Sequence, residues 1–323
     1  MLIGFRVYSV QSDSCLRPEV PIPMLALRHV LYFVALGMFW GISPSLYKYW
    51  GESGVPVSHV ISYTGFGLAI FLFLMARLKE GAWTVSGPLF RYGLVCATLM
   101  NVPFAWSLTL ARHVPAPELA IVFSVSPIVS FIVGAVTGRD PFTARRVLAI
   151  AFGFAASTIL VLTREGMLSG QVSWWLIAAF INPLLWATYN WYAQTNWPKE
   201  GTTFSVGAAE SLLSGLLALP FVLVMAPPWA TTYSSTAWWS LVFATAMWLA
   251  ERVSFFTLIR ERGASYTSQA VYLSSPAAVF IAMYFFGGAG DVWLWFSLGL
   301  LMVALYLNNS GQPVRRDAIP QSS

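Results

Sequence analysis

The sequence predicts an all-α integral membrane protein with ten transmembrane helices, arranged as two inverted five-helix repeats. Three observations predict this fold: a composition poor in charge, ten apolar runs of helical length, and motifs that recur between the two halves. Of the 323 residues, 57% are hydrophobic and only 10% are charged, whereas a soluble domain carries roughly 25% charged residues. Lipid is therefore the natural solvent for most of the surface.

The ten apolar runs are each close to the roughly 20 residues that a helix needs to cross a hydrocarbon core of about 30 Å. Helices are required because backbone groups left unpaired in lipid are too costly. The runs are too long and too continuously apolar for the strands of a barrel. We expect spans at 29–49, 57–76, 89–110, 117–137, 146–163, 173–194, 203–226, 237–259, 265–286 and 291–308.

The distribution of basic residues predicts that both termini are cytoplasmic. With the N-terminus inside, the cytoplasmic segments hold fourteen Lys and Arg residues, and the opposite side holds three, Lys48, Arg112 and Arg164. This asymmetry fixes the orientation under the positive-inside rule. An even number of spans then returns the C-terminus, with its basic Arg315 and Arg316, to the cytoplasm.

The same pattern divides the chain into segments. The first segment is broken by prolines and lacks a sustained apolar core, so we expect a cytoplasmic tail and no cleaved signal peptide. Met24 is a second candidate for the start of translation, because the membrane pattern begins just after it. We expect a tail at 1–28, repeats at 29–163 and 173–308, a connecting loop at 164–172 and a C-terminal tail at 309–323.

Matched motifs in the two halves indicate an internal repeat. The Ser-Pro pair at 126–127 recurs at 275–276, an offset of 149 residues, and Trp40 and Trp186 are 146 residues apart. Because five spans is an odd number, the second half must enter the membrane with the opposite orientation. Inverted repeats are a common architecture of secondary transporters, whose central site opens to each side in turn.

Three further stretches resemble one known family: LGMFWG at 36–41, HVPAPELAI at 113–121 running on to the Ser-Pro pair, and LIRERGA at 258–264 followed by SQAVYL at 268–273. In their order and spacing they are similar to the EamA-like branch of the drug/metabolite transporter superfamily. The resemblance covers the chain from about residue 30 to about residue 310.

This resemblance implies a ten-helix inverted-repeat fold in a bacterial-type inner membrane, and export or exchange of small metabolites. Members of the family often carry Gly-Glu at the ends of the fourth and ninth helices. Here Gly138-Arg139 and Gly287-Gly288 stand at those places, so no role of those glutamates carries over. The family is functionally broad, and substrate identity does not transfer with the fold.

Polar and aromatic residues inside the spans are the candidates for a binding site, because polar groups in a membrane are functional hypotheses by default. Each also has a structural interpretation, as a bridge between helices or as packing. Asn190 and Tyr272 are two candidates of this kind. Such a site suits small amphipathic organic solutes, for example amino acids or amines. We expect a central cavity lined by Trp40, Asn101, Trp186, Tyr189, Glu251 and Gln269.

Glu210 and Arg252 are expected to form a structural ion pair. Each lies seven residues from the cytoplasmic end of its span, which places both about 10 Å into the membrane at a rise of about 1.5 Å per residue. Glu251 points about 100° away around the helix, so we expect it to face the cavity and to exchange a proton with the solute. For all three residues, the alternative to a functional role is a structural ion pair or snorkelling.

Two prolines and one acidic residue complete the set of candidates. Pro127 and Pro276 are expected to break their helices beside the site, with plain kinks as the alternative. Glu118 lies near the outer end of its span, where simple contact with water is the alternative to a functional role.

Enzyme chemistry is not indicated. The three histidines lie far apart, and the sequence contains no zinc-protease motif, no nucleophile elbow and no phosphate-binding loop, so transport would depend on gradients. Cys15 and Cys96 are expected to be ordinary thiols. We expect no cofactor, no metal and no nucleic acid; the partners are a small-molecule solute and the lipid bilayer, with a homodimer as one option. The alternative function is a membrane-embedded protein without transport activity, either an intramembrane enzyme or a receptor or structural protein.

Overall fold

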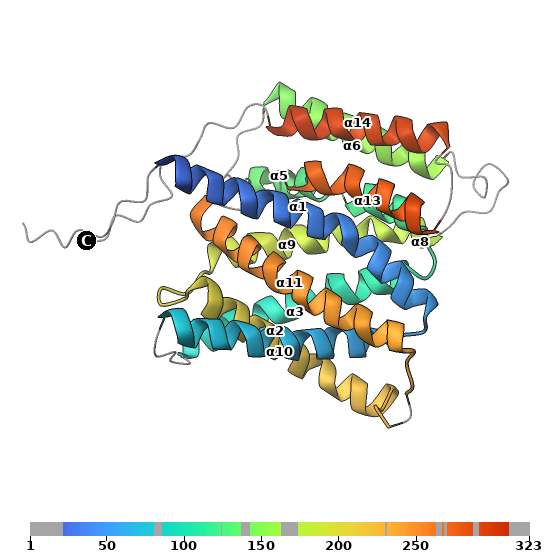
Figure 1. Ribbon diagram of the computed structural model, residues 1–323. Helices are drawn as coiled ribbons and strands as arrows, with labels where there is room; N and C mark the ends of the chain where they lie inside the picture. The colour runs from blue at the N-terminus through green and yellow to red at the C-terminus, as the bar shows by residue number, and fades with distance from the viewer. Residues whose placement is uncertain are drawn as a thin grey trace, which may run out of the picture.

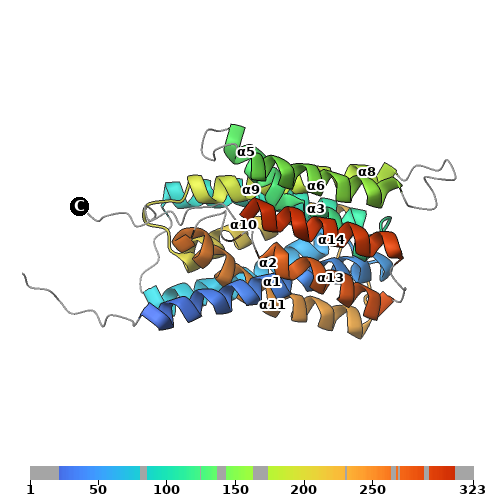
Figure 2. The ribbon, with the colours of Figure 1, turned by 90° about the horizontal axis from the view of Figure 1, so that it is seen from above.

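The computed structural model describes residues 22–80, 86–123, 125–136, 143–162, 174–229, 231–262, 267, 270–286 and 291–309. Within these ranges the regular structure is helical, and they contain no β-strand. The helices run alongside one another and form a single bundle, as the two views show (Figures 1 and 2). The expected all-α class is therefore confirmed for the described chain.

Helices occupy all ten of the ranges in which spans are expected. The first half contains α1 (Ile22–Glu52), α2 (Val57–Glu80), α3 (Gly87–Leu110), α4 (Ala116–Phe123), α5 (Ser126–Val136) and α6 (Ala144–Leu162). The second half contains α8 (Trp174–Ala179), α9 (Ile181–Thr195), α10 (Thr203–Met225), α11 (Ser235–Arg262), α13 (Val271–Phe286) and α14 (Val292–Asn309).

Five helices of the described chain are long and apolar enough to cross a membrane: α1, α2, α3, α10 and α11. Large apolar side chains also cover the outside of the bundle, and Val224 in α10 is 82% exposed. Monomeric soluble proteins rarely expose contiguous apolar surface on this scale. The architecture is that of a helical membrane protein.

Local sequence explains where two of the helices begin. Thr202 precedes α10 and accepts a hydrogen bond from the backbone N–H of Ser205, whose hydroxyl accepts one from the backbone N–H of Thr202. Ser86 caps α3 in the same way, through the backbone N–H of Leu89. Such caps satisfy backbone donors that have no partner within the helix.

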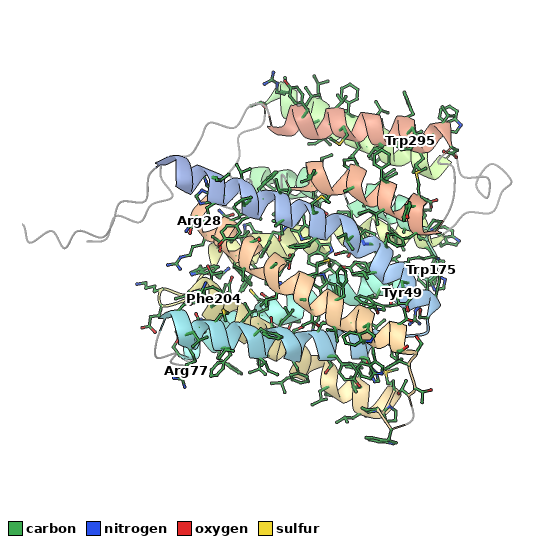
Figure 3. The ribbon with its side chains drawn as sticks, in the orientation of Figure 1. Arg28, Tyr49, Arg77, Trp175, Phe204 and Trp295 are labelled. Carbon is green, nitrogen blue, oxygen red and sulfur yellow. The ribbon has the colours of Figure 1, made fainter. Side chains whose placement is uncertain are left out.

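The two ends of the bundle carry different residues. Arg28 of α1, Arg77 of α2 and Phe204 of α10 lie at one end, and Tyr49 of α1 and Trp175 of α8 lie at the other (Figure 3). Helix α1 begins, and α14 ends, at the end that carries Arg28 (Figure 1). The start of the first described helix and the end of the last one therefore lie at the same end of the bundle.

Small residues allow helices from opposite halves to approach closely. A Cβ atom added at Gly41 of α1 would lie 2.9 Å from the Cβ of Ala277 in α13, and one at Gly37 would lie 2.9 Å from the carbonyl oxygen of Ala270. At Gly65 of α2 the added atom would lie 2.9 Å from the backbone nitrogen of Gly215 in α10. Glycine at these positions permits backbone-to-backbone packing, as in many membrane helix pairs.

The prolines behave differently from one another. In the fourth expected span, α4 ends at Phe123, Val125 lies in a turn, and α5 begins at Ser126 with Pro127 as its second residue. The hydroxyl of Ser126 donates to the carbonyl of Phe123 across the same point. Helix α13, by contrast, runs from Val271 to Phe286 with Pro276 inside it. The expected break at Pro276 is wrong, because an internal proline removes one backbone hydrogen bond without ending a helix that its neighbours support.

Candidate functional site

A cavity of about 150 Å³ lies among helices of both halves. Its lining is aromatic and polar, with side chains from α1, α2, α3, α9, α10 and α11 among others. Gln269 lies outside the described residues, as does the side chain of Tyr272. Asn190 lines the cavity, and so do five of the six residues expected to bind a solute: Trp40, Asn101, Trp186, Tyr189 and Glu251.

Glu210 and Arg252 form an ion pair at the wall of this cavity. Nη1 of Arg252 lies 2.9 Å from Oε1 of Glu210, and the two residues are only 8% and 1% exposed. The hydroxyl of Tyr189 lies 3.1 and 3.0 Å from the two carboxylate oxygens of Glu210 and accepts from Nη1 of Arg252 over 3.1 Å. Buried charges need this kind of pairing and hydrogen bonding.

Glu251 lies beside this ion pair and accepts a hydrogen bond from a residue in the first half of the sequence. The indole N–H of Trp40 donates to Oε1 of Glu251 over 3.0 Å. Oε2 of Glu251 is 3.8 Å from Nε of Arg252, and its side chain is 12% exposed. The expectation that Glu251 faces away from Arg252 is therefore wrong in part. The long guanidinium side chain reaches Glu210 with its tip while Nε stays near the preceding residue.

Aromatic rings build the remaining wall. Trp186 meets Tyr189 edge to face with ring centres 6.0 Å apart, and Tyr189 stacks on Phe255 at 5.7 Å. On the other side, Trp248 meets the ring of Phe104 at 5.2 Å, again edge to face. Interlocked rings of this kind resist rotation, so they provide a rigid apolar surface.

Asn101 bridges two helices. Its Nδ2 donates to the backbone carbonyl of Ser214 over 3.0 Å, and its Oδ1 accepts from the hydroxyl of the same residue. These bonds join α3 to α10. The amide lines the cavity, but its bonds to Ser214 give it the structural role that sequence offers as the alternative.

Several lining residues do not stand out in the sequence. Trp248 and Tyr47 belong to a chain rich in aromatic residues, and no spacing distinguishes them from packing residues. Ser211 is 3% exposed, and its hydroxyl has no hydrogen-bond partner in the described part of the chain. Its position next to Glu210 is the only signal that could have singled it out.

Two further polar clusters lie at the ends of the bundle. At the end that carries Arg28, the carboxylate of Glu261 binds Nη2 of Arg28 at 2.5 Å and Nε2 of His29 at 2.6 Å, which joins α1 to α11. At the other end, Nε2 of His59 lies 2.5 Å from the carbonyl oxygen of Ala226, and the hydroxyl of Tyr233 bonds to Nδ1 of His59. In the sequence, the only observation on these histidines is that they belong to no metal-binding motif. The described residues contain no group of three or more His, Cys, Asp or Glu side chains that could hold a metal ion.

Glu118 is buried rather than in contact with water. Only 7% of the residue is exposed, and α4, which carries it, packs mainly on α13 and α1. Its position near the end of an expected span suggested solvation, and packing by helices distant in sequence prevents it.

Known proteins resemble this chain in fold but give it no family. No family model matches the chain, and no curated protein matches it. One solved structure, described only as "Crystal structure of protein", is similar to this chain with a TM-score of 0.58 and 13% sequence identity. The similarity covers 88% of this chain and 97% of the other. At that identity it shows that the two chains share a fold, and it assigns no activity.

Proposed function

We propose that this protein is a secondary active transporter that moves small organic metabolites, such as amino acids or amines, across the inner cell membrane by alternating access. One observation carries the proposal: a polar and aromatic cavity with buried charges lies inside a helical membrane-type bundle, among helices from both halves. Ionisable groups within membrane segments commonly mark solute and ion pathways.

The contacts between helices support an inverted repeat of ten spans. Exchanging each helix for its counterpart in the other half turns α1 on α11 into α9 on α3, and α3 on α10 into α11 on α2; all four pairs are in contact. The pairs α2 with α10 and α6 with α14 map onto themselves, and both are in contact. A two-fold relation between the halves predicts this pattern, and secondary transporters commonly have such a relation.

The charged residues at the bundle ends support the orientation. Arg28 and Arg77 lie at the end where α1 begins and α14 ends (Figure 3), so we assign this end to the cytoplasm under the positive-inside rule. Reporter fusions at the C-terminus and near Ala230 test the assignment. The C-terminal reporter should be active only inside, and the reporter near Ala230 only outside; an external C-terminus would overturn the orientation or the number of spans.

Glu251 is our candidate for coupling transport to protons. It lines the cavity and is less completely enclosed than Glu210, and it shares Arg252 only at the longer distance. The Glu210–Arg252 pair is proposed to be structural. The motifs at 36–41, 113–121 and 258–273 support membership of the EamA-like branch of the drug/metabolite transporters, which also fits a ten-helix exporter or exchanger.

Flux through the purified protein in proteoliposomes tests the function. Vesicles with and without an imposed pH gradient are loaded with a panel of labelled amines and amino acids, and empty vesicles and Glu251→Gln vesicles serve as controls. We expect the wild-type protein to release solute at a rate that the pH gradient accelerates, and the Glu251→Gln protein to release it at a rate that the gradient does not change. No flux of any solute above empty vesicles would favour the alternative, a membrane protein without transport activity.

A further inference from the structure

The ionisable groups that line the cavity do not balance in charge. Arg252 and Glu251 line it, with Glu210 directly behind Arg252, and the described lining contains no second cationic side chain. Two carboxylates and one guanidinium leave one negative charge when all three are ionised. An uncompensated charge in a buried site is costly, so the cavity favours a ligand that brings one positive charge.

The geometry assigns that surplus charge to Glu251. Arg252 directs its Nη1 to Glu210 at 2.9 Å and to the hydroxyl of Tyr189 at 3.1 Å, and reaches Glu251 only through Nε at 3.8 Å. Glu251 receives its close hydrogen bond from Trp40, a neutral donor. The carboxylate is therefore oriented by a neutral residue and is left with acceptor capacity for a cation.

The lining also offers the other groups that an organic cation needs. Trp40, Trp186 and Trp248 line the cavity, and indole rings attract ammonium groups through their faces. Ser211 lines the same space and is 3% exposed, with a hydroxyl that has no partner among the described residues. By contrast, the hydroxyls of Ser43, Ser107 and Thr64 bond to carbonyls of their own helices.

We infer that the cavity binds a monovalent organic cation with an apolar body, and that the carboxylate of Glu251 binds its ammonium group. This inference rests on the proposed function and narrows its solute class from amines or amino acids to amines. A carboxylate on the solute would require a free cation in the lining. Arg252, the cation present there, is engaged by Glu210 and Tyr189.

The test uses four solutes that share one indole body: tryptamine, which carries an ammonium group; tryptophol, which is neutral; indole-3-acetate, an anion; and tryptophan, a zwitterion. Binding to the full-length protein in lipid nanodiscs is measured by calorimetry at neutral pH, with hexylammonium as a non-aromatic cation. We expect tryptamine to bind at least about tenfold more tightly than the other three indoles, since a charge-assisted hydrogen bond to Glu251 is worth at least that factor.

Two variants assign the preference to one residue. Glu251→Gln keeps an acceptor for the indole of Trp40 and should weaken tryptamine binding about tenfold or more, with no change for tryptophol. Glu52→Gln, which removes a carboxylate paired with Lys48 on the surface, should leave both unchanged. Equal or tighter binding of indole-3-acetate or tryptophan, an unchanged Glu251→Gln variant, or no binding by either cation would each overturn the inference.

Flux separates this inference from the function on which it rests. Cation binding without flux in proteoliposomes would reject transport and leave the assignment of Glu251 intact. Flux with a preference for anions or zwitterions would keep transport and reject the cation site.

Discussion

Trp40 and Glu251 are joined by a hydrogen bond of 3.0 Å although they lie 211 residues apart in the sequence. Trp40 belongs to the first half and Glu251 to the second, so this bond connects the halves at the cavity wall. Through Glu251 it continues to Arg252, Tyr189 and Glu210. A single polar network thus contains groups from α1, α9, α10 and α11.

Removal of the indole donor should loosen Glu251. Trp40→Phe keeps an aromatic ring in the wall and removes the N–H that orients the carboxylate. We expect a loss of unfolding free energy of about 1 kcal/mol, the usual worth of one hydrogen bond, together with weaker solute binding. Thermal unfolding and binding are measured on the same purified variant. Unchanged binding would show that the bond does not position Glu251.

The ion pair at the cavity wall should reveal itself in a double-mutant cycle. Glu210→Ala and Arg252→Ala should each lower the yield and stability of folded protein by about 3 kcal/mol or more, because each leaves a buried charge without its partner. The double variant should recover part of that loss. Stability that is no better in the double variant than in the worse single variant would argue against a stabilising pair.

A surface pair provides the matched control for that cycle. Lys48 and Glu52 lie four residues apart on α1, with Nζ 3.3 Å from Oε1. Exposed pairs of this spacing contribute about 0.3–0.5 kcal/mol. Lys48→Ala and Glu52→Ala should therefore change stability little, alone or together, under the same measurement.

Glu251 should control how transport responds to pH. Its carboxylate lies near the charged groups of Arg252 and Glu210 and accepts from Trp40, and Tyr47 is also close enough to interact with it electrostatically. Glu251→Gln cannot exchange a proton, so we expect flux that no longer varies with pH while folded yield stays normal. If wild type and variant show the same dependence of flux on pH, Glu251 is not the group that exchanges the proton.

Close backbone packing predicts opposite effects for two glycine substitutions. Gly65→Ala places a methyl group about 3 Å from backbone atoms of α10, which cannot move aside, and should destabilise the protein by at least about 1–3 kcal/mol. At Gly299 in α14 the added group would meet no atom of another described segment within 4 Å, and Gly299→Ala should stabilise by up to about 1 kcal/mol through helix propensity. Thermal unfolding of both variants is the measurement, and equal shifts would contradict the packing.

Tyr233, in the connection between α10 and α11, should titrate late. Burial, with a smaller contribution from Tyr63, raises the pKa of Tyr233 from 10.0 to about 12. The neutral hydroxyl is the form favoured by the fold, so its contribution to stability should be complete below about pH 10 and lost as the pH rises through about 12. Phenolate absorbance of wild type minus Tyr233→Phe measures this titration. A midpoint near 10 would contradict the burial of this hydroxyl.

The lengths and composition of the apolar runs were sufficient to predict the helices, and positions along the spans were sufficient to predict part of the site. The apolar runs predicted all ten helical ranges because lipid imposes a length and leaves no alternative secondary structure. Equal depth along two neighbouring spans was sufficient to bring Glu210 and Arg252 together. These quantities depend on distance along the chain, which sequence supplies directly.

Side-chain reach and distant packing were not predictable in the same way. Glu251 lies near Arg252 because a guanidinium can bind at its tip and along its side, which the 100° rule for helix positions ignores. Glu118 is buried on α4, whose main neighbours α13 and α1 are distant in the sequence, and Pro276 stays within its helix. Each outcome depends on which helices become neighbours, and periodicity in one segment carries no information about that.

The close packing of α1 on α13 and of α2 on α10 changes what can move as a unit. Each of these pairs takes one helix from residues 29–163 and one from 173–308, and glycines bring their backbones into contact. Separating the sequence halves would therefore break these close contacts between helices. Helices that move as one rigid body are therefore expected to come from both halves of the sequence, because the two halves interlock through these contacts.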